Sequence, residues 1–254
     1  MKTLTLSAKE LRAIDKMVAH FVENTAKFES LLSSWDSMIS SSKELQKLIH
    51  TTKGRVKDPT HLRDKLIRKF IEAKAAGLAP DYNPDNLFQR VNDLAGLRII
   101  HLHTRQIEGI HKELLGIFEE YRWVVKEGPI AKTWDIENRA YFKSIGFDPE
   151  ESDSLYTSVH YVLQPNSKSE LTCEIQVRTL MEEVWGEVDH TINYPKKSEL
   201  LACREQIKVL ARMTSSCSRL VDSIFLSDSD GAKSPLLVAS KRRSTVRTSA
   251  NGKA

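Results

Sequence analysis

The sequence predicts an α+β fold in which helices flank a mixed β-sheet of about four to five strands. Short segments rich in β-branched residues occur at 96–103, 122–126, 156–163 and 171–178, bounded by polar or turn-forming residues. Apolar residues recur every three or four positions over most of the remaining chain, which is typical of helices. The last two strands follow each other across the polar segment 164–170, so they form a hairpin rather than a parallel strand–helix–strand unit.

The predicted helices have recognisable starts and stops. Asp58 can cap the first turn of a helix that begins with Pro59 and runs to Gly77. The other predicted helices cover 8 to about 50, 105–121, 179–193 and about 198–227. The segment 127–153 contains glycines, prolines and several acidic residues, so we expect a long loop there, of the kind that is usually functional or mobile.

The composition excludes several classes of protein. Of the 254 residues, 40% are hydrophobic and 28% are charged, which is enough for a buried core. No apolar run approaches the roughly 18 residues of a membrane span, and the N-terminus lacks the apolar stretch of a signal peptide. The three cysteines lack disulfide or zinc-site spacing. We therefore expect a cytoplasmic protein without a membrane partner.

The net charge of +4 is a property of the C-terminal tail. Six basic and no acidic residues follow Gly231, which leaves 32 basic against 34 acidic residues in the rest of the chain. A folded part with this balance lacks the excess positive charge of a DNA-binding surface, so no DNA partner is expected.

The hairpin carries the residues with the most chemical information. Alternate residues of both strands are apolar, which predicts that one face of the hairpin is buried. The opposite face carries Tyr156, Ser158, His160, Glu174, Gln176 and Arg178. A loop symmetric about Ser167 would place His160 opposite Glu174, Ser158 opposite Gln176 and Tyr156 opposite Arg178. These residue types suit the stacking of a base and the binding of phosphates; the alternative is an ordinary solvated sheet face.

A second group of candidate residues is basic. Arg55 and Lys57 precede the helix that starts at Pro59, and Lys65, Arg68 and Lys69 lie on it. Lys65 and Lys69 are four residues apart and so share one face. Cations around a helix start suit a polyphosphate, although a solvated lysine-rich face has the same pattern. Neither the phosphate-binding P-loop motif nor the Rossmann glycine motif occurs.

A carboxylate precedes the first predicted strand. Asp93 lies just before the strand that carries Arg98, where it can hold a magnesium ion together with Glu174. Magnesium is usually bound through one or two carboxylates and the phosphates of a substrate. The alternative for Asp93 is a turn or helix cap.

Four segments of the chain resemble motifs of the RelA/SpoT synthetase domain family. Arg55-Val56-Lys57 with Lys65 and Lys69 resembles its basic segment, and the sequence from Asp93 to Ile100 resembles its Asp-containing strand. Tyr156-Thr157-Ser158-Val159-His160 resembles G-Y-x-S-x-H, and the sequence from Glu174 to Thr179 resembles E-[IV]-Q-[IV]-R-T. The order of the segments and the missing hydrolase domain make the chain similar to the small, single-domain alarmone synthetases. Two positions depart from the pattern: Leu155 replaces the glycine, and His61 replaces a small residue.

The resemblance implies a nucleotidyltransferase-like fold and a pyrophosphokinase activity. The enzyme would transfer the β,γ-pyrophosphate of ATP to the 3′-hydroxyl of GDP or GTP, with Mg²⁺ as cofactor, to make (p)ppGpp and AMP. Carried over by position, Arg55 and Arg98 bracket the adenine, Lys57, Lys65 and Lys69 hold the ATP phosphates, and Asp93 and Glu174 hold the metal. Tyr156 stacks on the acceptor guanine, with Ser158 and His160 nearby. Glu174 holds the metal or accepts the proton of the 3′-hydroxyl, and Gln176 orients Glu174. Arg178 binds phosphate.

The resemblance also divides the chain into expected parts. These are an N-terminal helical segment (1–52), a synthetase domain (53–195), a C-terminal helix packed on it (196–229) and a basic, disordered tail (230–254).

Two other functions stay open. A toxin-type relative would pyrophosphorylate the 3′ end of tRNA or an adenine nucleotide, and the basic tail and the 127–153 segment would suit RNA. Its partners would include a neutralising antitoxin or further copies of the chain. An inactive nucleotide-sensing module is the third hypothesis, but the presence of both Asp93 and Glu174 argues against it.

Overall fold

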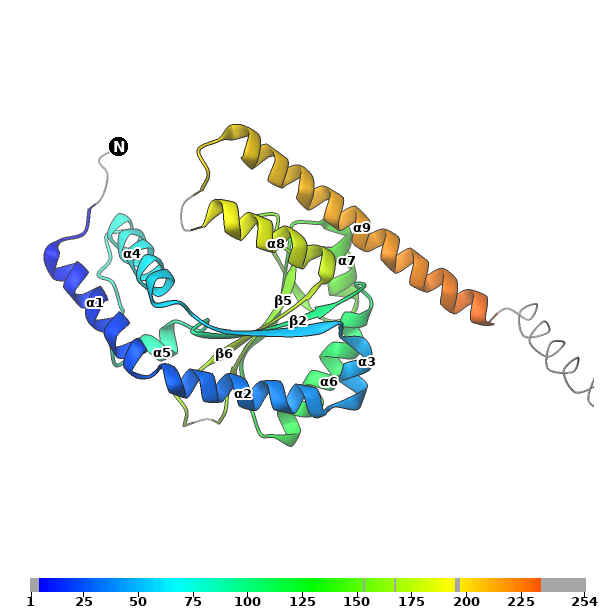
Figure 1. Ribbon diagram of the computed structural model, residues 1–254, viewed down its shortest axis with the longest axis horizontal. Helices are drawn as coiled ribbons and strands as arrows, with labels where there is room; N and C mark the ends of the chain where they lie inside the picture. Colours follow the sequence, from blue (N-terminus) through cyan, green and yellow to red (C-terminus); the bar gives the residue numbers. More distant parts are fainter. Residues whose placement is uncertain (1–4, 153, 167, 195–196, 234–254) are drawn as a thin grey trace, which may run out of the picture.

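The centre of this protein is a six-stranded mixed β-sheet with helices on both faces (Figure 1). The computed structural model describes residues 5–152, 154–166, 168–194 and 197–233. The strands are β1 (Thr51–Val56), β2 (Ala95–His101), β3 (Val124–Thr133), β4 (Asp148–Glu151), β5 (Ser158–Gln164) and β6 (Cys173–Thr179). The helices are α1 (Ala8–Glu23), α2 (Thr25–Ser41), α3 (Lys43–Leu48), α4 (Pro59–Ala75), α5 (Leu87–Arg90), α6 (Gln106–Glu120), α7 (Ile136–Ser144), α8 (Leu180–Asn193) and α9 (Leu201–Lys233). None of the described helices is long and apolar enough to span a membrane.

The sheet has the strand order β1-β2-β6-β5-β3-β4. β2 and β6 are parallel, β5 is antiparallel to both of its neighbours, β1 is antiparallel to β2, and β4 is parallel to β3. This confirms the α+β class and the mixed sheet. The strand count exceeds the expected four to five because two edge strands, β1 and β4, have mostly exposed, charged sequences without a clear apolar alternation.

The expected loop at 127–153 is wrong. This segment contains most of β3, all of α7 and all of β4. Gly128 and Pro129 do not end β3, because they lie where its register with β5 shifts twice, and such bulges tolerate both residue types. α7 is capped by Asp135, whose Oδ1 accepts hydrogen bonds from the backbone nitrogens of Glu137 and Asn138.

The hairpin register also differs from the symmetric one. His160 pairs with Gln176, and Glu174 pairs with Val162, so the strands are displaced by two residues from the expected alignment. A displacement by an even number keeps every side chain on its face of the sheet. The shared face of His160, Gln176 and Arg178 is therefore preserved, and only the expected partners across it are wrong.

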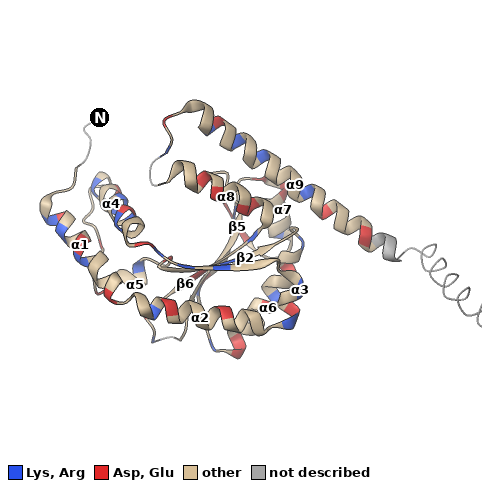
Figure 2. Cartoon of the chain, in the orientation of Figure 1, with Lys and Arg blue, Asp and Glu red and all other residues tan. Residues whose placement is uncertain are grey.

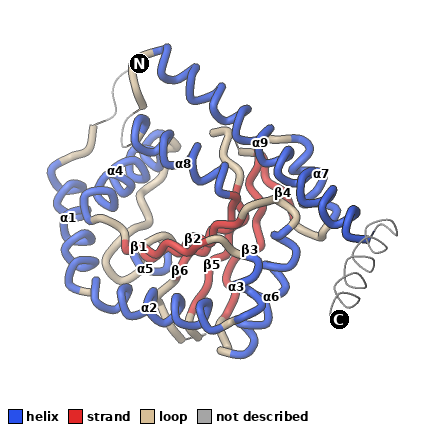
Figure 3. The backbone as a smooth tube through the Cα atoms, turned by 45° about the vertical axis from the view of Figure 1, so that its right-hand side comes forward, coloured by secondary structure: helices blue, strands red, loops and turns tan. Residues whose placement is uncertain are grey.

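Helices cover both faces of the sheet. Figures 1 and 3 show α2 and α6 on one side, with α8 and α9 on the other. The helical period expected over 8 to about 50 is divided into α1, α2 and α3, with breaks at Asn24 and Ser42. Their apolar residues belong to the main core together with those of the sheet, and β1 begins at Thr51, just before the expected boundary at 52.

A second, smaller core joins the two C-terminal helices. Trp185 of α8 packs against Ile207 and Ala211 of α9, and its indole nitrogen donates a hydrogen bond of 3.1 Å to the carbonyl of Ile207. Further along α9, Ser215 and Arg219 donate hydrogen bonds of 2.6 and 2.7 Å to Oδ2 of the buried Asp135. These contacts fix α9 against α8 and the start of α7. Most of the expected tail at 230–254 lies outside the described residues.

Candidate functional site

Two adjoining cavities lie between the sheet, α4 and α8. The small basic cavity, of about 210 Å³, is lined by Arg55, Lys57, Asp58, His61, Lys65, Arg68, Asp93, His190 and Tyr194. The large cavity, of about 530 Å³, lies over β2, β5 and β6 and extends to α9. Arg55, His190 and Tyr194 line both cavities. The hydroxyl of Tyr194 donates a hydrogen bond of 3.3 Å to the carbonyl of His61, which links the end of α8 to α4.

The small basic cavity is organised around Asp93. Its two carboxylate oxygens bind Nζ of Lys57 at 2.7 Å and Nζ of Lys65 at 2.8 Å. Burial by itself would raise the pKa of Asp93, but the attraction of Lys65 and Lys57 outweighs it and lowers the pKa from 3.8 to about 2. The end of β1 holds Lys57 in place through a backbone hydrogen bond to Leu94. The Asp58 cap of α4, which the sequence predicted, is present.

Lys69 is not brought to this cavity. Its ammonium group binds Glu72 at 2.8 Å on a half-exposed surface one turn further along α4. Arg68 and His61 line the cavity instead. Arg68 belongs to the basic group predicted on this helix, and its position three residues after Lys65 places it near the same helix face. The binding of phosphate by Lys69 stays a prediction.

Tyr156, His160 and Gln176 of the hairpin line the large cavity, and hydrogen bonds connect them with Glu174, which does not line it. Nδ1 of His160 lies 2.9 Å from Oε1 of Glu174, and the amide of Gln176 donates a hydrogen bond of 2.7 Å to the other carboxylate oxygen. The hydroxyl of Tyr156 donates to the amide oxygen of Gln176 at 3.4 Å. Burial would raise the pKa of Glu174, but the hydrogen bond and charge of His160 lower it overall. The carboxylate form of Glu174 is therefore favoured.

Carboxylates of α8 orient two arginines of the floor. Nη1 of Arg98 lies 3.0 Å from Glu183 and also contacts Glu187, while Arg178 contacts the second oxygen of Glu183. The guanidinium of Arg178 also donates to the hydroxyl of Tyr156 at 3.4 Å and lies 5.7 Å from the centre of its ring. The two glutamates were not among the predicted site residues, because only the fold brings α8 against β2 and β6.

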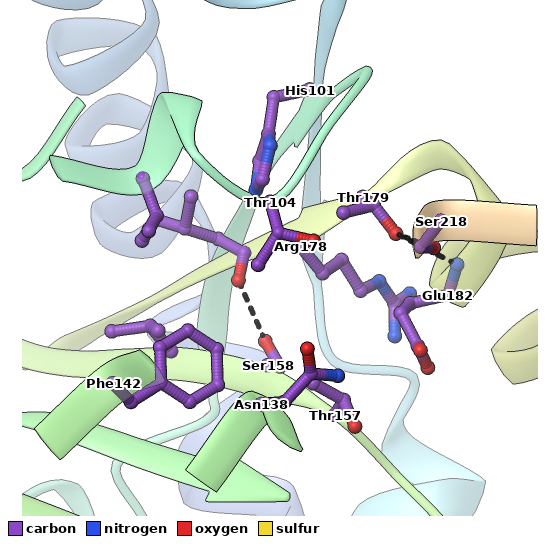
Figure 4. Close-up of a pocket in the computed structure, with 13 residues that line it drawn as sticks. His101, Thr104, Asn138, Phe142, Thr157, Ser158, Arg178, Thr179, Glu182 and Ser218 are labelled. Atoms are coloured by element: carbon purple, nitrogen blue, oxygen red, sulfur yellow. Dashed lines mark hydrogen bonds between the residues drawn. The ribbon is translucent and has the colours of Figure 1, made fainter. Parts of the chain in front are cut away.

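Ser158 differs from its neighbours in the hairpin. It is buried, it donates a hydrogen bond of 3.2 Å to the carbonyl of Val177, and it lines a separate cavity of about 20 Å³ instead of the large one (Figure 4). Arg178 and Glu182 line this enclosed cavity as well. Burial raises the pKa of Glu182 to about 8, so this carboxyl group is mostly protonated at neutral pH.

An aromatic cluster separates the two cavities. The ring of His190 stacks on that of Tyr194 with centroids 4.6 Å apart, and His61 meets the same tyrosine edge-on at 4.8 Å. The guanidinium of Arg68 lies 5.4 Å from the centre of the Tyr194 ring. Tyr194 follows the four resembling segments, and its place in the site could not be read from the sequence. The sequence places His190 at the end of a helix, and the resemblance implies only a minor role for it in the site.

The carboxylates present fit a magnesium ion that is completed by a substrate. Among the described residues, no group of three or more acidic, histidine or cysteine side chains forms a metal cage. Each oxygen of Asp93 and of Glu174 accepts a single side-chain hydrogen bond and keeps a lone pair. Magnesium commonly binds one or two carboxylates and takes its other ligands from phosphates and water, which these two residues allow.

Comparisons with known proteins agree with the motifs and the fold. A family model described as "Region found in RelA / SpoT proteins" matches residues 54–199. The GTP pyrophosphokinase YjbM of Bacillus subtilis (strain 168) is 28% identical over 169 residues, which are 66% of this chain and 66% of that protein. This chain therefore aligns with about two thirds of that relative's length.

Two solved structures share the architecture. Small alarmone synthetase 2 from Bacillus subtilis superposes with a TM-score of 0.57 at 18% identity, over 81% of this chain and 97% of that one. Small alarmone synthetase 1 from the same organism, bound to its product pppGpp, gives a TM-score of 0.52 at 20% identity, over 86% and 97% of the two chains. At these identities the structural matches establish a common fold.

Proposed function

Because this chain belongs to the RelA/SpoT family, we propose that it transfers the β,γ-pyrophosphate of ATP to the 3′-hydroxyl of GDP or GTP, releasing AMP. The observation that carries this proposal is the pair of adjoining cavities, one lined by cations and the other lined by Tyr156, His160 and Gln176, of which the last two hold the carboxylate of Glu174. Such a pair suits a donor and an acceptor nucleotide. The name of the related GTP pyrophosphokinase and the pppGpp bound to the similar synthetase support the same reaction.

The small basic cavity is the proposed site of the ATP phosphates. Lys57 and Lys65 would exchange Asp93 for phosphate oxygens, with Arg68 adding a further cation. Arg55 lines both cavities and Arg98 lies on the floor of the large one, so they are the residues proposed to bracket the adenine. Phosphoryl-type transfer needs positioning and distributed positive charge more than covalent assistance, and this set of cations supplies both.

The large cavity is the proposed acceptor site. Tyr156 would stack on the guanine, and Glu174 would accept the proton of the 3′-hydroxyl as its oxygen attacks the β-phosphorus of ATP. The bond from this phosphorus to the oxygen shared with the α-phosphate breaks, and AMP leaves with that oxygen. His160 and Gln176 hold the Glu174 carboxylate by hydrogen bonds, and Arg178 is placed to bind the transferred group. Because Ser158 is buried and bonded to the backbone, it acts on this site through the sheet.

Magnesium is the proposed cofactor. Asp93 and Glu174 would hold it, and the ion would neutralise charge that develops on the phosphates during transfer.

The RNA acceptor is a weaker candidate. The segment 127–153, which suited RNA as a free loop, is folded into β3, α7 and β4. The basic residues at 241–247 lie outside the described part of the chain. Binding of tRNA, of an antitoxin or of a second copy stays a prediction.

The proposed reaction is tested with ATP labelled on the γ-phosphate and with GDP, GTP, no acceptor or bulk tRNA in separate tubes. We expect the label on a guanine nucleotide, with AMP released in equal amount. Label on tRNA alone would mean that the acceptor is tRNA and not a guanine nucleotide. The absence of AMP in every tube would contradict the proposed activity.

A variant isolates the role of Glu174. Glu174→Gln should lower turnover by about 100-fold or more while ATP and GDP still bind in calorimetry, because it removes the proton acceptor and one of the two proposed metal carboxylates but none of the cations that bind phosphate. The matched control is Glu170→Gln in the exposed turn of the same hairpin. Unchanged turnover of Glu174→Gln would remove this residue from the mechanism.

A further inference from the structure

The first turns of α9 add a basic wall to the large cavity. Arg204 and Lys208 of this helix line the cavity, together with Lys197 of the segment before it. Figure 2 shows basic residues on α9 as well as on α4. Arg204 and Lys208 lie beyond residue 199, where the match to the RelA/SpoT family ends.

The packing of α9 determines which of its residues meet the cavity. Arg204, Ile207, Lys208 and Ala211 follow the spacing i, i+3, i+4, i+7 and therefore share one face of the helix. Ile207 and Ala211 are buried against Trp185, and the indole of Trp185 donates to the Ile207 carbonyl. This anchor fixes the rotation of the helix, so the two cations on the same face are held beside the cavity.

The charge of this wall is less compensated than that of the floor. Arg98 and Arg178 on the floor are paired with Glu183 and Glu187. Within the described residues, Arg204 has no ion pair, and Lys208 binds only the exposed Glu205 at 2.7 Å. The only aspartate or glutamate that lines the cavity among these residues is Asp189. The wall formed by α9 therefore favours an anionic group of the ligand.

The position of this wall relative to Tyr156 suggests which group that is. Leu155 and Tyr156 pack on the same small core as Ile207 and Leu210, so the proposed base-stacking residue and the first turns of α9 are neighbours. A nucleotide stacked on Tyr156 with its 3′-hydroxyl at Glu174 must direct its 5′ substituent to another wall. The cations at α9, of which only Lys208 has an acidic partner among the described residues, suit that substituent when it is a phosphate chain.

We propose that Arg204 and Lys208 bind the 5′-phosphate chain of the acceptor and select a nucleoside 5′-diphosphate or triphosphate. The proposal rests on the acceptor site assigned above. A 5′-diphosphate presents more negative charge than a 5′-monophosphate, and the 3′-terminal nucleotide of an RNA presents a single phosphodiester charge on its 5′ side. The basic wall therefore favours free nucleotides over an RNA end.

The test compares acceptor and donor kinetics in the double variant Arg204→Ala/Lys208→Ala. We expect the KM for GDP and GTP to rise about tenfold or more, because charge-assisted hydrogen bonds to phosphate are lost. The KM for ATP should stay within about twofold, and the KM for GMP, which lacks the second phosphate, should change least among the acceptors. The control is Arg212→Ala, an exposed residue of the same helix that does not line the cavity.

The outcomes separate this proposal from the proposed activity. An unchanged KM for GDP, or an equal rise for ATP, would overturn the role of the two cations while leaving pyrophosphate transfer intact. If the wild type transfers nothing to a guanine nucleotide, the proposed pyrophosphokinase activity is wrong. Calorimetric binding of GDP and of guanosine then tests separately whether Arg204 and Lys208 bind the 5′-phosphate chain. Tighter binding of GDP than of guanosine, lost in the double variant, would support it, and equal binding by both proteins would overturn it.

Discussion

His160 and Glu174 are in contact across the β5–β6 hairpin although they are not partners in its ladder. Nδ1 of the histidine lies 2.9 Å from the carboxylate, while the ladder pairs His160 with Gln176. Such diagonal contacts are within reach of long side chains on adjacent strands. Because Gln176 donates to the other oxygen, the carboxylate of Glu174 is held from both strands.

Loss of the histidine should loosen this carboxylate. We expect His160→Ala to lower kcat by about tenfold or more, since a misplaced general base loses much of its effect, with little change in the KM for ATP. His160→Gln, which keeps a hydrogen-bond donor, should retain more activity than His160→Ala. Equal losses in the two variants would show that the contact does not orient Glu174.

The ion pairs of Asp93 should make stability depend on pH. The folded-state pKa of about 2 lies below the ordinary 3.8, so the carboxylate stabilises the fold fully above pH 4 and loses this contribution as the pH falls towards 2. Asp93→Asn should therefore cost about 2 kcal/mol at pH 7 and much less near pH 2. Urea unfolding of both proteins in metal-free buffer measures the difference, and a cost independent of pH would contradict the assignment.

The contribution of Glu182 to folding stability should depend on pH in the opposite direction. Its pKa of about 8 in the folded state exceeds the ordinary 4.5, so the folded state keeps a proton that the unfolded state loses, and stability falls as the pH rises from about 4.5 to 8. Glu182→Gln removes this titration. The variant should match the wild type near pH 4 and be more stable by a few kcal/mol at pH 8. A stability difference that stays constant over this range would refute the raised pKa.

Leu155 combines backbone strain with apolar packing. Its φ of 58° is in the left-handed region, and its side chain packs on the Trp185 core. We expect Leu155→Val to destabilise by about 1–2 kcal/mol and Leu155→Gly by less, because a β-branched residue tolerates this conformation poorly and glycine adopts it freely.

The helical residue Leu210 provides the control for this ranking. It packs on the same core but lies within α9, so its glycine variant should be less stable than its valine variant. Urea unfolding ranks the four proteins, and the same order at both positions would show that backbone strain at Leu155 is negligible.

The sequence predicted the features that depend on a local residue pattern, and it missed those that depend on contacts between segments distant in the chain. The alternation of the hairpin identified the face with His160 and Gln176, because the apolar residues of the opposite face belong to the main core. The expected solvation of the polar face is wrong for β5, whose residues 158–163 are all buried, because helices cover both faces of the sheet (Figure 1). The register could not be obtained from the length of the 164–170 segment. β3 continued through Gly128 and Pro129 because β5 pairs with it on both sides of the irregularity, a contact that no local motif encodes.

The candidate site follows the same division. Lys57, Lys65 and Asp93 come from separate segments, and the fold brings them into one ion-paired group. Lys69 shares the helix with Lys65, but the cavity does not extend to it. The glutamates that hold Arg98 and Arg178 come from α8, and the cations of the basic wall come from α9; neither follows a motif, because each depends on how a helix is rotated against the sheet.

The contact of Asp135 with α9 ties the C-terminal helix to the family-matched region. Asp135 lies within 54–199, but its partners Ser215 and Arg219 do not. A fragment ending at 199 would leave this buried carboxylate without those partners and would expose the apolar surface of Trp185 to water. We therefore expect a fragment ending at 199 to be less stable than the chain that includes α9.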